Sequence, residues 1–212
     1  MSENINQDGV IKKSIRKINS IRQQGVLLFV RITIDRIALH ALRQIYGFHP
    51  WHADAPLSAR PYRRTLANMV NKLNPNCVVE VGCGLGVTLE LIQAQQRWGY
   101  DHDAGAIRAG RLLRDKAIKF IEGNLSNVEQ DSINVLILVN WIHEYSPEEL
   151  YAWLKPLLPR TNYLILDAID LDNDSNYKYK HDFKFLAGHS LCIESVKPEN
   201  EGRQFHLYKV IR

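Results

Sequence analysis

The stretch VVEVGCGLG, residues 78–86, joins a run of valines to three glycines at alternate positions. A strand that ends in glycines and leads into a helix is typical of nucleotide-binding sites, because glycine lets a ligand approach the backbone and a helix N-terminus offers free N–H groups. The spacing differs from the dinucleotide motif G-x-G-x-x-G, since Val87 stands where its last glycine would fall. No lysine follows, as one would in a P-loop. The stretch therefore predicts a nucleotide-like ligand without a pyrophosphate group.

The carboxylate of Glu80, inside the same strand, indicates the charge of that ligand. At the C-terminal end of a strand, beside the glycines, it would repel a phosphate group and attract a cation. S-adenosylmethionine carries a sulfonium and an ammonium group and has no phosphate. We therefore expect S-adenosylmethionine as the cofactor, with its methionine end facing Glu80.

Strand and helix patterns alternate along most of the chain. Strands are predicted at CVVEV (77–81), RWGYD (97–101), AIKFIEG (117–123), INVLILVN (133–140), NYLILDAI (162–169), CIESVK (192–197) and RQFHLYKVI (203–211). Helices are predicted at 10–46 with a break at Gly25, and at 61–73, 87–96, 104–115 and 147–158, the last with Ser146 as its N-cap. This alternation predicts an α/β fold with a Rossmann-like, doubly wound and mostly parallel sheet. An antiparallel hairpin around PENEG completes it at the C-terminal end, and a helical extension precedes it.

Charge is distributed unevenly along the 212 residues. Residues 1–43 hold eight Lys or Arg and three Asp or Glu, whereas the remainder holds 19 and 20. We therefore divide the chain into a basic helical extension with a cap loop, residues 1–60, and a main domain, residues 61–212. We expect no nucleic acid binding, and peripheral contact with anionic lipid through residues 10–43 as an amphipathic helix. The alternative is that this helix packs on the domain or on a second copy in a homo-oligomer.

The N-terminal sequence and the cysteines indicate the cellular compartment. The N-terminal sequence MSENINQDGV has no signal-peptide pattern. The cysteines, Cys77, Cys83 and Cys192, have neither zinc-site nor disulfide-framework spacing. We therefore expect a cytoplasmic protein, located peripherally at the inner membrane surface, without a bound metal.

The motif VVEVGCGLG resembles the first motif of class I S-adenosylmethionine-dependent methyltransferases, and the resemblance extends over roughly residues 62–212. It implies that an acid at the end of the second strand accepts both ribose hydroxyls, here Asp101 or, as the alternative, Asp103. It also implies a contact with the adenine amino group after the third strand, where Asn124 replaces the usual Asp. The cofactor-binding residues implied in this way are Glu80, Gly82, Cys83, Gly84, Gly86, Asp101, His102, Asn124, Leu125 and Asn140.

The resemblance places the reacting methyl group at the end of the fourth strand, where the sequence reads LVNWIHEYSPEEL, residues 138–150. A hydroxyl acceptor must lose its proton, and histidine suits a general base near neutral pH. We therefore predict His143 as the base, oriented by Glu144. The alternative is that His143 packs under the following helix. A metal is not expected, because Pro147 stands where H-E-x-x-H has its second histidine.

Two further stretches are rich in aromatic and basic residues. GFHPWHADAPLSARPY, residues 47–62, reads as a loop that could close the cofactor site, and NYKYKHDF, residues 176–183, follows the fifth strand. Such side chains can stack on a sugar and hydrogen-bond it, although each could instead be surface packing. The candidate acceptor-binding residues are His49, Trp51, His52, Arg60, Tyr62, Tyr177, Tyr179 and His181.

The basic N-terminal helix together with HPWH, RPY, VNWIHEYSPEEL and YKYKHDF also resembles small methyltransferases encoded with bacterial surface-polysaccharide (O-antigen-type) synthesis. That resemblance implies O-methylation of a sugar in a glycan or glycolipid precursor. Two alternatives stay open: a methyltransferase for a small metabolite or a nucleic acid base, and a non-catalytic module that binds the cofactor.

Overall fold

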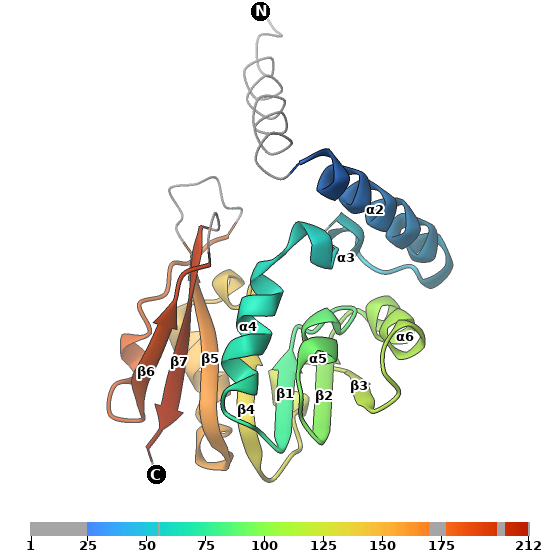
Figure 1. Ribbon diagram of the computed structural model, residues 1–212. Helices are drawn as coiled ribbons and strands as arrows, with labels where there is room; N and C mark the ends of the chain where they lie inside the picture. The colour runs from blue at the N-terminus through green and yellow to red at the C-terminus, as the bar shows by residue number, and fades with distance from the viewer. Residues whose placement is uncertain (1–24, 55, 170–176, 199–201, 212) are drawn as a thin grey trace, which may run out of the picture.

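The computed structural model describes residues 25–54, 56–169, 177–198 and 202–211, and these contain one sheet with the strand order β3-β2-β1-β4-β5-β7-β6 (Figure 1). The strands are β1 Cys77–Val81, β2 Gln96–Asp101, β3 Ile118–Glu122, β4 Ile133–Leu138, β5 Thr161–Ile169, β6 Ser190–Val196 and β7 Arg203–Val210. Strands β1 to β5 pair in parallel, and β7 pairs antiparallel with β5 and β6. The predicted Rossmann-like sheet and its antiparallel hairpin are therefore confirmed.

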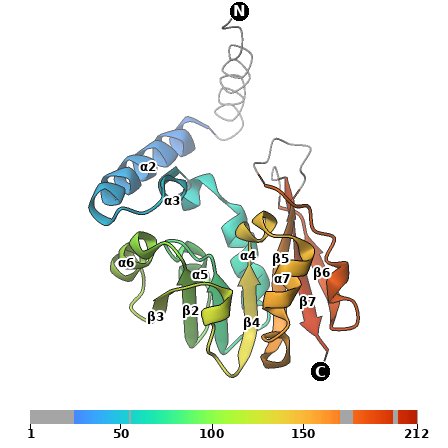
Figure 2. The same cartoon turned by 180° about the vertical axis from the view of Figure 1, so that it is seen from behind.

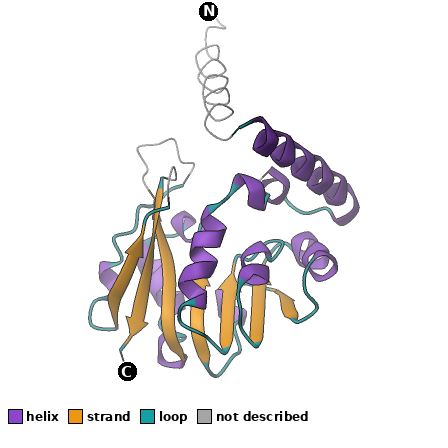
Figure 3. Cartoon of the chain, viewed as in Figure 1, coloured by secondary structure: helices purple, strands orange, loops and turns teal. Residues whose placement is uncertain are grey.

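Helices cover both faces of this sheet. The helices of the described residues are α2 Val26–Tyr46, α3 Pro50–Asp54, α4 Tyr62–Asn71, α5 Val87–Leu91, α6 Ala104–Leu113 and α7 Pro147–Leu154 (Figure 3). Figure 1 shows α4 and α5 in front of the sheet, and Figure 2 shows α7 on the other side. Strand β4 packs Val135 and Ile137 toward α4 and α5, and Leu136 and Leu138 toward α7. Burial on both faces explains why this strand has no polar alternation.

The order of the strands reverses between β1 and β4. The chain runs outward from β1 to β2 and β3 on one side, and from β4 to β5 on the other. Doubly wound sheets bind ligands beyond the carboxyl ends of the strands at such a switch point. The glycine loop follows β1 and Asn140 follows β4, so both lie at this position.

Helices α5 and α7 end at least one turn before the predicted residues. Helix α5 ends at Leu91, because the side chain of Asn71 donates to the Leu91 carbonyl at 3.1 Å and accepts from the Gln93 N–H at 2.8 Å. Helix α7 ends at Leu154, since Pro156 cannot supply the N–H that a longer helix would need.

The N-cap predicted for α7 is confirmed. The Ser146 hydroxyl accepts from the Glu149 N–H at 3.2 Å, and the Glu149 carboxylate accepts from the Ser146 N–H at 2.8 Å. This reciprocal pair is a capping box, which satisfies two backbone groups at the start of the helix.

The N-terminal part of the described chain is a helical layer above the sheet (Figure 1). Helix α2 begins directly after Gly25, where a break was predicted, while residues 10–24 of the predicted helix lie outside the described residues. The stretch 47–62 is not a plain loop, because it contains α3 and a 3-10 turn at Leu57–Ala59. Helix α2 packs on α3 and α6 with one side. Among the described helices, none has the length and hydropathy to cross a membrane.

Candidate functional site

The glycine loop after β1 needs glycine for both conformation and space. Gly82, Gly84 and Gly86 have φ values of 76°, 53° and 69°, a region that side chains disfavour. A Cβ atom at Gly82 would lie 2.3 Å from the ring of Trp141, and one at Gly84 would lie 2.6 Å from Nδ1 of His52. Trp141 is held there by its indole N–H, which donates to the Val81 carbonyl at 2.7 Å. The loop therefore lies against side chains from two other segments.

Glu80 is a buried carboxyl group that the described protein satisfies only in part. It is 6% exposed, and its Oε2 has no hydrogen-bond partner among the described residues. Burial raises the pKa of Glu80 to about 7, and the nearby charge of Asp101 adds to this, while Arg63 and a hydrogen bond from Thr88 act in the opposite direction. A buried carboxyl group with an unused oxygen fits a ligand that brings a positive charge.

Asp101, at the end of β2, connects two loops. Its Oδ2 accepts from the Gly84 N–H at 2.7 Å, and its Oδ1 accepts from the Asp103 N–H at 2.9 Å. The adjacent His102 is 92% exposed, with Nδ1 3.7 Å from Oδ1 of Asp101. A carboxylate has about four acceptor positions, so Asp101 keeps capacity for ribose hydroxyls beside these bonds.

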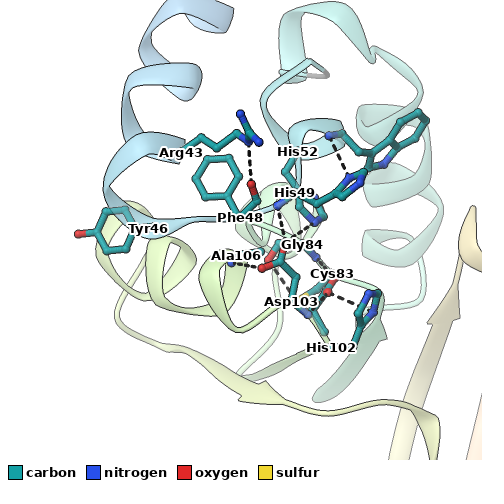
Figure 4. A network of polar contacts seen from close by, with 12 residues as sticks. Arg43, Tyr46, Phe48, His49, His52, Cys83, Gly84, His102, Asp103 and Ala106 are labelled. Carbon is teal, nitrogen blue, oxygen red and sulfur yellow. Dashed lines mark hydrogen bonds and ion pairs between the residues drawn. The ribbon is translucent and has the colours of Figure 1, made fainter.

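Helix α3 is held over the glycine loop through Asp103 (Figure 4). Asp103 caps α6 by accepting from the Ala106 N–H at 3.0 Å, and it also accepts from the His49 N–H at 2.7 Å. Nε2 of His52 lies 3.5 Å from the same carboxylate. Burial lowers the pKa of His52, against the raising effect of Asp101 and Asp103. The stretch predicted to close the cofactor site therefore does lie against the glycine loop.

Asn124 is fastened to its own turn after β3. Its Oδ1 accepts from the N–H of Ser126 at 2.9 Å and from the Ser126 hydroxyl at 2.7 Å, and its N–H donates to Asn127 at 2.8 Å. The described hydrogen bonds of the Asn124 side chain involve its oxygen and not its amide nitrogen. The adenine contact of Asn124 stays a prediction.

Two of the residues predicted to bind the cofactor, Cys83 and Leu125, bury their side chains in apolar packing. Cys83 packs against β2, where its sulfur would lie 2.7 Å from a Cβ atom at Gly99. Leu125 is 1% exposed and belongs to the main core. For these two residues, only the main chain is left for a contact with a bound molecule.

His143 is completely buried, and its acidic partner is Asp167. Nε2 of His143 lies 3.2 Å from Oδ1 of Asp167, while its Nδ1 is buried and has no partner among the described residues. Glu144, which was predicted to orient His143, pairs with Lys178 at 3.4 Å, and its orienting role stays a prediction. Asp167 and His143 come from β5 and from the turn after β4, so the parallel pairing of these strands brings them together.

Asn140 lies at the centre of a polar network at the end of β4. Its φ of 75° is unusual for a residue other than glycine, and its N–H donates to Asp167 at 2.9 Å. Arg203 donates through one nitrogen to the Asn140 amide oxygen at 2.5 Å and to Asp167 at 2.9 Å. The Asn140 amide nitrogen lies 3.4 Å from the hydroxyl of Tyr62. The network therefore joins α4, β4, β5 and β7.

Several of the predicted acceptor residues lie next to this network. The guanidinium of Arg60 lies 3.8 Å from the ring centre of Trp51, and that of Arg203 lies 4.3 Å from the ring centre of Tyr62. The ring of Tyr177 is 5.2 Å from that of His143. Four of the predicted residues therefore belong to one region, although some precede and one follows the glycine loop in the sequence: Trp51, Arg60, Tyr62 and Tyr177.

The last two predicted acceptor residues, Tyr179 and His181, lie in the segment after β5. Tyr179 is half-exposed, and its N–H donates to the His143 carbonyl at 2.9 Å. His181 is buried, with Nε2 3.0 Å from the Ile142 carbonyl and its ring stacked on Phe183. Both contacts attach the segment after β5 to the turn after β4.

Two arginines of this region were not predicted from the sequence. Arg63 lies in the first turn of α4, where a positive charge opposes the helix dipole. This unfavourable position could have indicated from the sequence that Arg63 has a functional role. Arg203 lies on β7, and only the antiparallel pairing with β5 places it beside Asp167.

Comparisons with known proteins bear on the fold. No protein-family model matches the sequence, and no curated protein matches it either. The mitomycin 7-O-methyltransferase MmcR is similar in structure, with a TM-score of 0.61 at 9% identity over 80% of this chain and 60% of that one. Magnesium protoporphyrin IX methyltransferase from Synechocystis PCC 6803, solved with bound S-adenosylmethionine, has a TM-score of 0.58 at 16% identity over 86% and 96%.

WbdD, described as a bifunctional kinase-methyltransferase, is also similar, with a TM-score of 0.55 at 16% identity over 70% of this chain. The chain spans 40% of the length of WbdD. At these identities, the likeness establishes the fold, which is the Rossmann-like fold of methyltransferases.

Proposed function

We propose that the protein is an S-adenosylmethionine-dependent methyltransferase. The observation that carries this proposal is the position of Glu80, a buried carboxyl group with an unused oxygen beside a glycine loop at the switch point of the sheet. A dinucleotide would bring phosphate to this position, whereas S-adenosylmethionine brings cations. The similar fold of a methyltransferase solved with bound S-adenosylmethionine supports the same ligand.

The residues present fit both charges of the methionine end. Glu80 would take the cationic groups, and Arg63, close enough to lower the pKa of Glu80, would take the carboxylate. Asp101 would accept from the ribose, and the main chain of the glycine loop would lie along the ligand. When bound, the cofactor supplies an electrophilic methyl group on sulfur.

His143 is the base that we propose for the acceptor hydroxyl. A carboxylate can only accept hydrogen bonds, so the contact with Asp167 places the ring proton on Nε2 and leaves Nδ1 as the proton acceptor. The buried Nδ1 has no partner among the described residues, which fits this role. The Tyr177 ring packs beside His143, so the acceptor would have to displace part of this packing to reach it.

The acceptor that we propose is a sugar of a glycan or glycolipid precursor. The region of Trp51, Arg60, Tyr62 and Tyr177 supports this, because aromatic faces and hydrogen-bond donors together suit a sugar ring. A comparison of surface glycans from strains with and without the gene should reveal one missing methyl group in the latter. Identical glycans would exclude this class of acceptor.

Calorimetry of the purified protein tests the cofactor. S-adenosylmethionine and S-adenosylhomocysteine should both bind, while NAD should give no heat of binding. Binding of NAD without binding of S-adenosylmethionine would contradict the proposal.

We propose in addition that the outer face of α2 lies on an anionic membrane surface. Its apolar side chains point away from the domain, with Leu27, Ile37 and Ile45 exposed by 88%, 65% and 74%. The net positive charge of residues 1–43 complements anionic lipid, whereas the rest of the chain carries one more acidic than basic residue. Apolar area and positive charge together are what an interfacial helix requires.

Substitution of Ile34 and Ile37 by glutamine should remove this contact. Both are exposed, at 59% and 65%, so the fold and the binding of S-adenosylhomocysteine should not change. We expect the wild type to sediment with vesicles that contain phosphatidylserine and the double variant to stay in the supernatant. If the substitutions instead convert a dimer into a monomer in analytical ultracentrifugation, the face is an interface between two copies.

A further inference from the structure

Three guanidinium groups surround the buried hydroxyl-bearing ring of Tyr62. Arg203 lies over this ring at 4.3 Å, while Arg60 and Arg63 flank Tyr62 in the sequence at the start of α4. Burial by itself would raise the pKa of Tyr62, yet the charges of Arg63, Arg60 and Arg203 lower it overall. This arginine cluster (Arg60, Arg63 and Arg203) is therefore an electropositive position at the end of β4.

Within this cluster, Arg60 has no anionic partner among the described residues. Arg203 pairs with Asp167 at 2.9 Å, but no described carboxylate lies within ion-pair distance of Arg60. Burial lowers the pKa of Arg60 to about 10, and the neighbouring Arg63 and Arg203 contribute to the shift against the raising effect of Tyr62. Arg60 is partly buried beside two other guanidinium groups and has no described anion of its own, which costs free energy that a bound anion would recover.

Arg60 and Arg63 act on different parts of the site. Arg63 influences the carboxyl group of Glu80, so it belongs to the cofactor end. Both arginines influence Tyr62, but only Arg60 also influences Tyr177, whose ring lies 5.2 Å from the ring of His143. Arg60 therefore belongs to the side on which the acceptor would bind.

We propose that Arg60 and the Tyr62 hydroxyl bind an oxyanion, either a carboxylate or a phosphate group, on the methyl acceptor. This inference rests on the proposed methyltransferase function and narrows its acceptor to an acidic sugar or a sugar phosphate. The planar guanidinium can bind two oxygens side by side, and its stacking on Trp51 fixes its plane while leaving its N–H edges for the ligand. Arg203 is a positioning residue, because it holds Asn140 and Asp167 and stacks on Tyr62.

The test measures binding of inorganic phosphate and of acetate to protein saturated with S-adenosylhomocysteine, at constant ionic strength set with chloride. We expect at least one of the two anions to bind, and the one that binds identifies phosphate or carboxylate as the recognised group. Arg60→Gln should weaken that binding by about 10- to 100-fold, as expected for a charge-assisted hydrogen bond worth about 1.5–3 kcal/mol. Arg64→Gln, a matched control on the exposed side of the same helical turn, should bind like the wild type.

Three results would overturn the inference: binding of neither anion, equal binding by Arg60→Gln, or loss of S-adenosylhomocysteine binding in Arg60→Gln. The last result would assign Arg60 to the cofactor and leave the proposed function intact. If the wild type fails to bind S-adenosylhomocysteine, the proposed function fails, and the same anion titration without it still tests Arg60. Should Arg60→Gln not fold, Arg60→Lys keeps the charge and loses the bidentate geometry, so it should bind several-fold more weakly.

Discussion

Replacement of Glu80 by glutamine is expected to weaken the binding of S-adenosylmethionine by roughly 10- to 100-fold, because a charge-assisted interaction worth about 1.5–3 kcal/mol is lost. The side chain keeps its size and can still accept the hydrogen bond from Thr88, so the glycine loop should keep its shape. Calorimetry of both proteins measures the change. Glu122→Gln, at an exposed position at the end of β3, is the matched control and should bind like the wild type.

The same substitution should stabilise the unliganded protein above neutral pH. The pKa of Glu80 is about 7 in the folded state, above its ordinary 4.5, so the folded protein retains a proton that the unfolded chain has already lost between these values. Wild-type stability should therefore fall as the pH rises from about 4.5 to 7 and then level off. Glutamine has no proton to lose, so Glu80→Gln should gain up to roughly 3 kcal/mol relative to the wild type at pH 8, at about 1.36 kcal/mol per pKa unit.

Thermal unfolding of both proteins at pH 5 and pH 8 checks the sign, since the difference between the two should be much smaller at the lower value. A residue that costs stability in the free protein and is needed for binding is characteristic of a ligand site. If Glu80→Gln binds S-adenosylmethionine as tightly as the wild type, the cationic end of the ligand lies elsewhere.

Replacement of His143 by alanine is expected to lower turnover by about 10²- to 10⁴-fold, the range typical of general-base catalysis. The affinity for S-adenosylhomocysteine should barely change, because the base contacts the acceptor. His143 is completely buried, so its removal also leaves a cavity, and thermal unfolding must accompany the rate measurement. His189→Ala, a more exposed position where the ring is hydrogen-bonded to Tyr151, serves as the control.

Asp167→Asn separates a catalytic from a packing role for His143. Asparagine keeps the shape, but it removes the carboxylate that holds the Nε2 proton, so turnover should fall while the fold persists. If His143→Ala keeps most of the turnover in a folded protein, positioning of the reactants is sufficient. If the His143→Ala variant unfolds and the Asp167→Asn variant has normal turnover, His143 has a structural role.

The elements that could be predicted from the sequence depend on local physical chemistry. The positive φ of Gly82, Gly84 and Gly86 explains their alternate spacing, which already marked the loop in the sequence. Burial on both faces explains the apolar run of β4, and the capping box of Ser146 and Glu149 marks the start of α7. Each signal lies within a few residues of the feature that it predicts.

Other features depend on contacts between distant segments, which no local pattern encodes. Asn71 ends α5 early by occupying the groups that a further turn would use, and it lies 20 residues away from Leu91. The contacts of the site join residues that lie further apart in the sequence, since 24 residues separate Asp167 from His143 and 63 separate Arg203 from Asn140. The sequence by itself determined the order of strands and helices, the glycine loop and the charge beside it. Only the tertiary structure decided that Asp167 accompanies His143 and that Arg203 joins Tyr62, because the pairing of β4, β5 and β7 brings these side chains together.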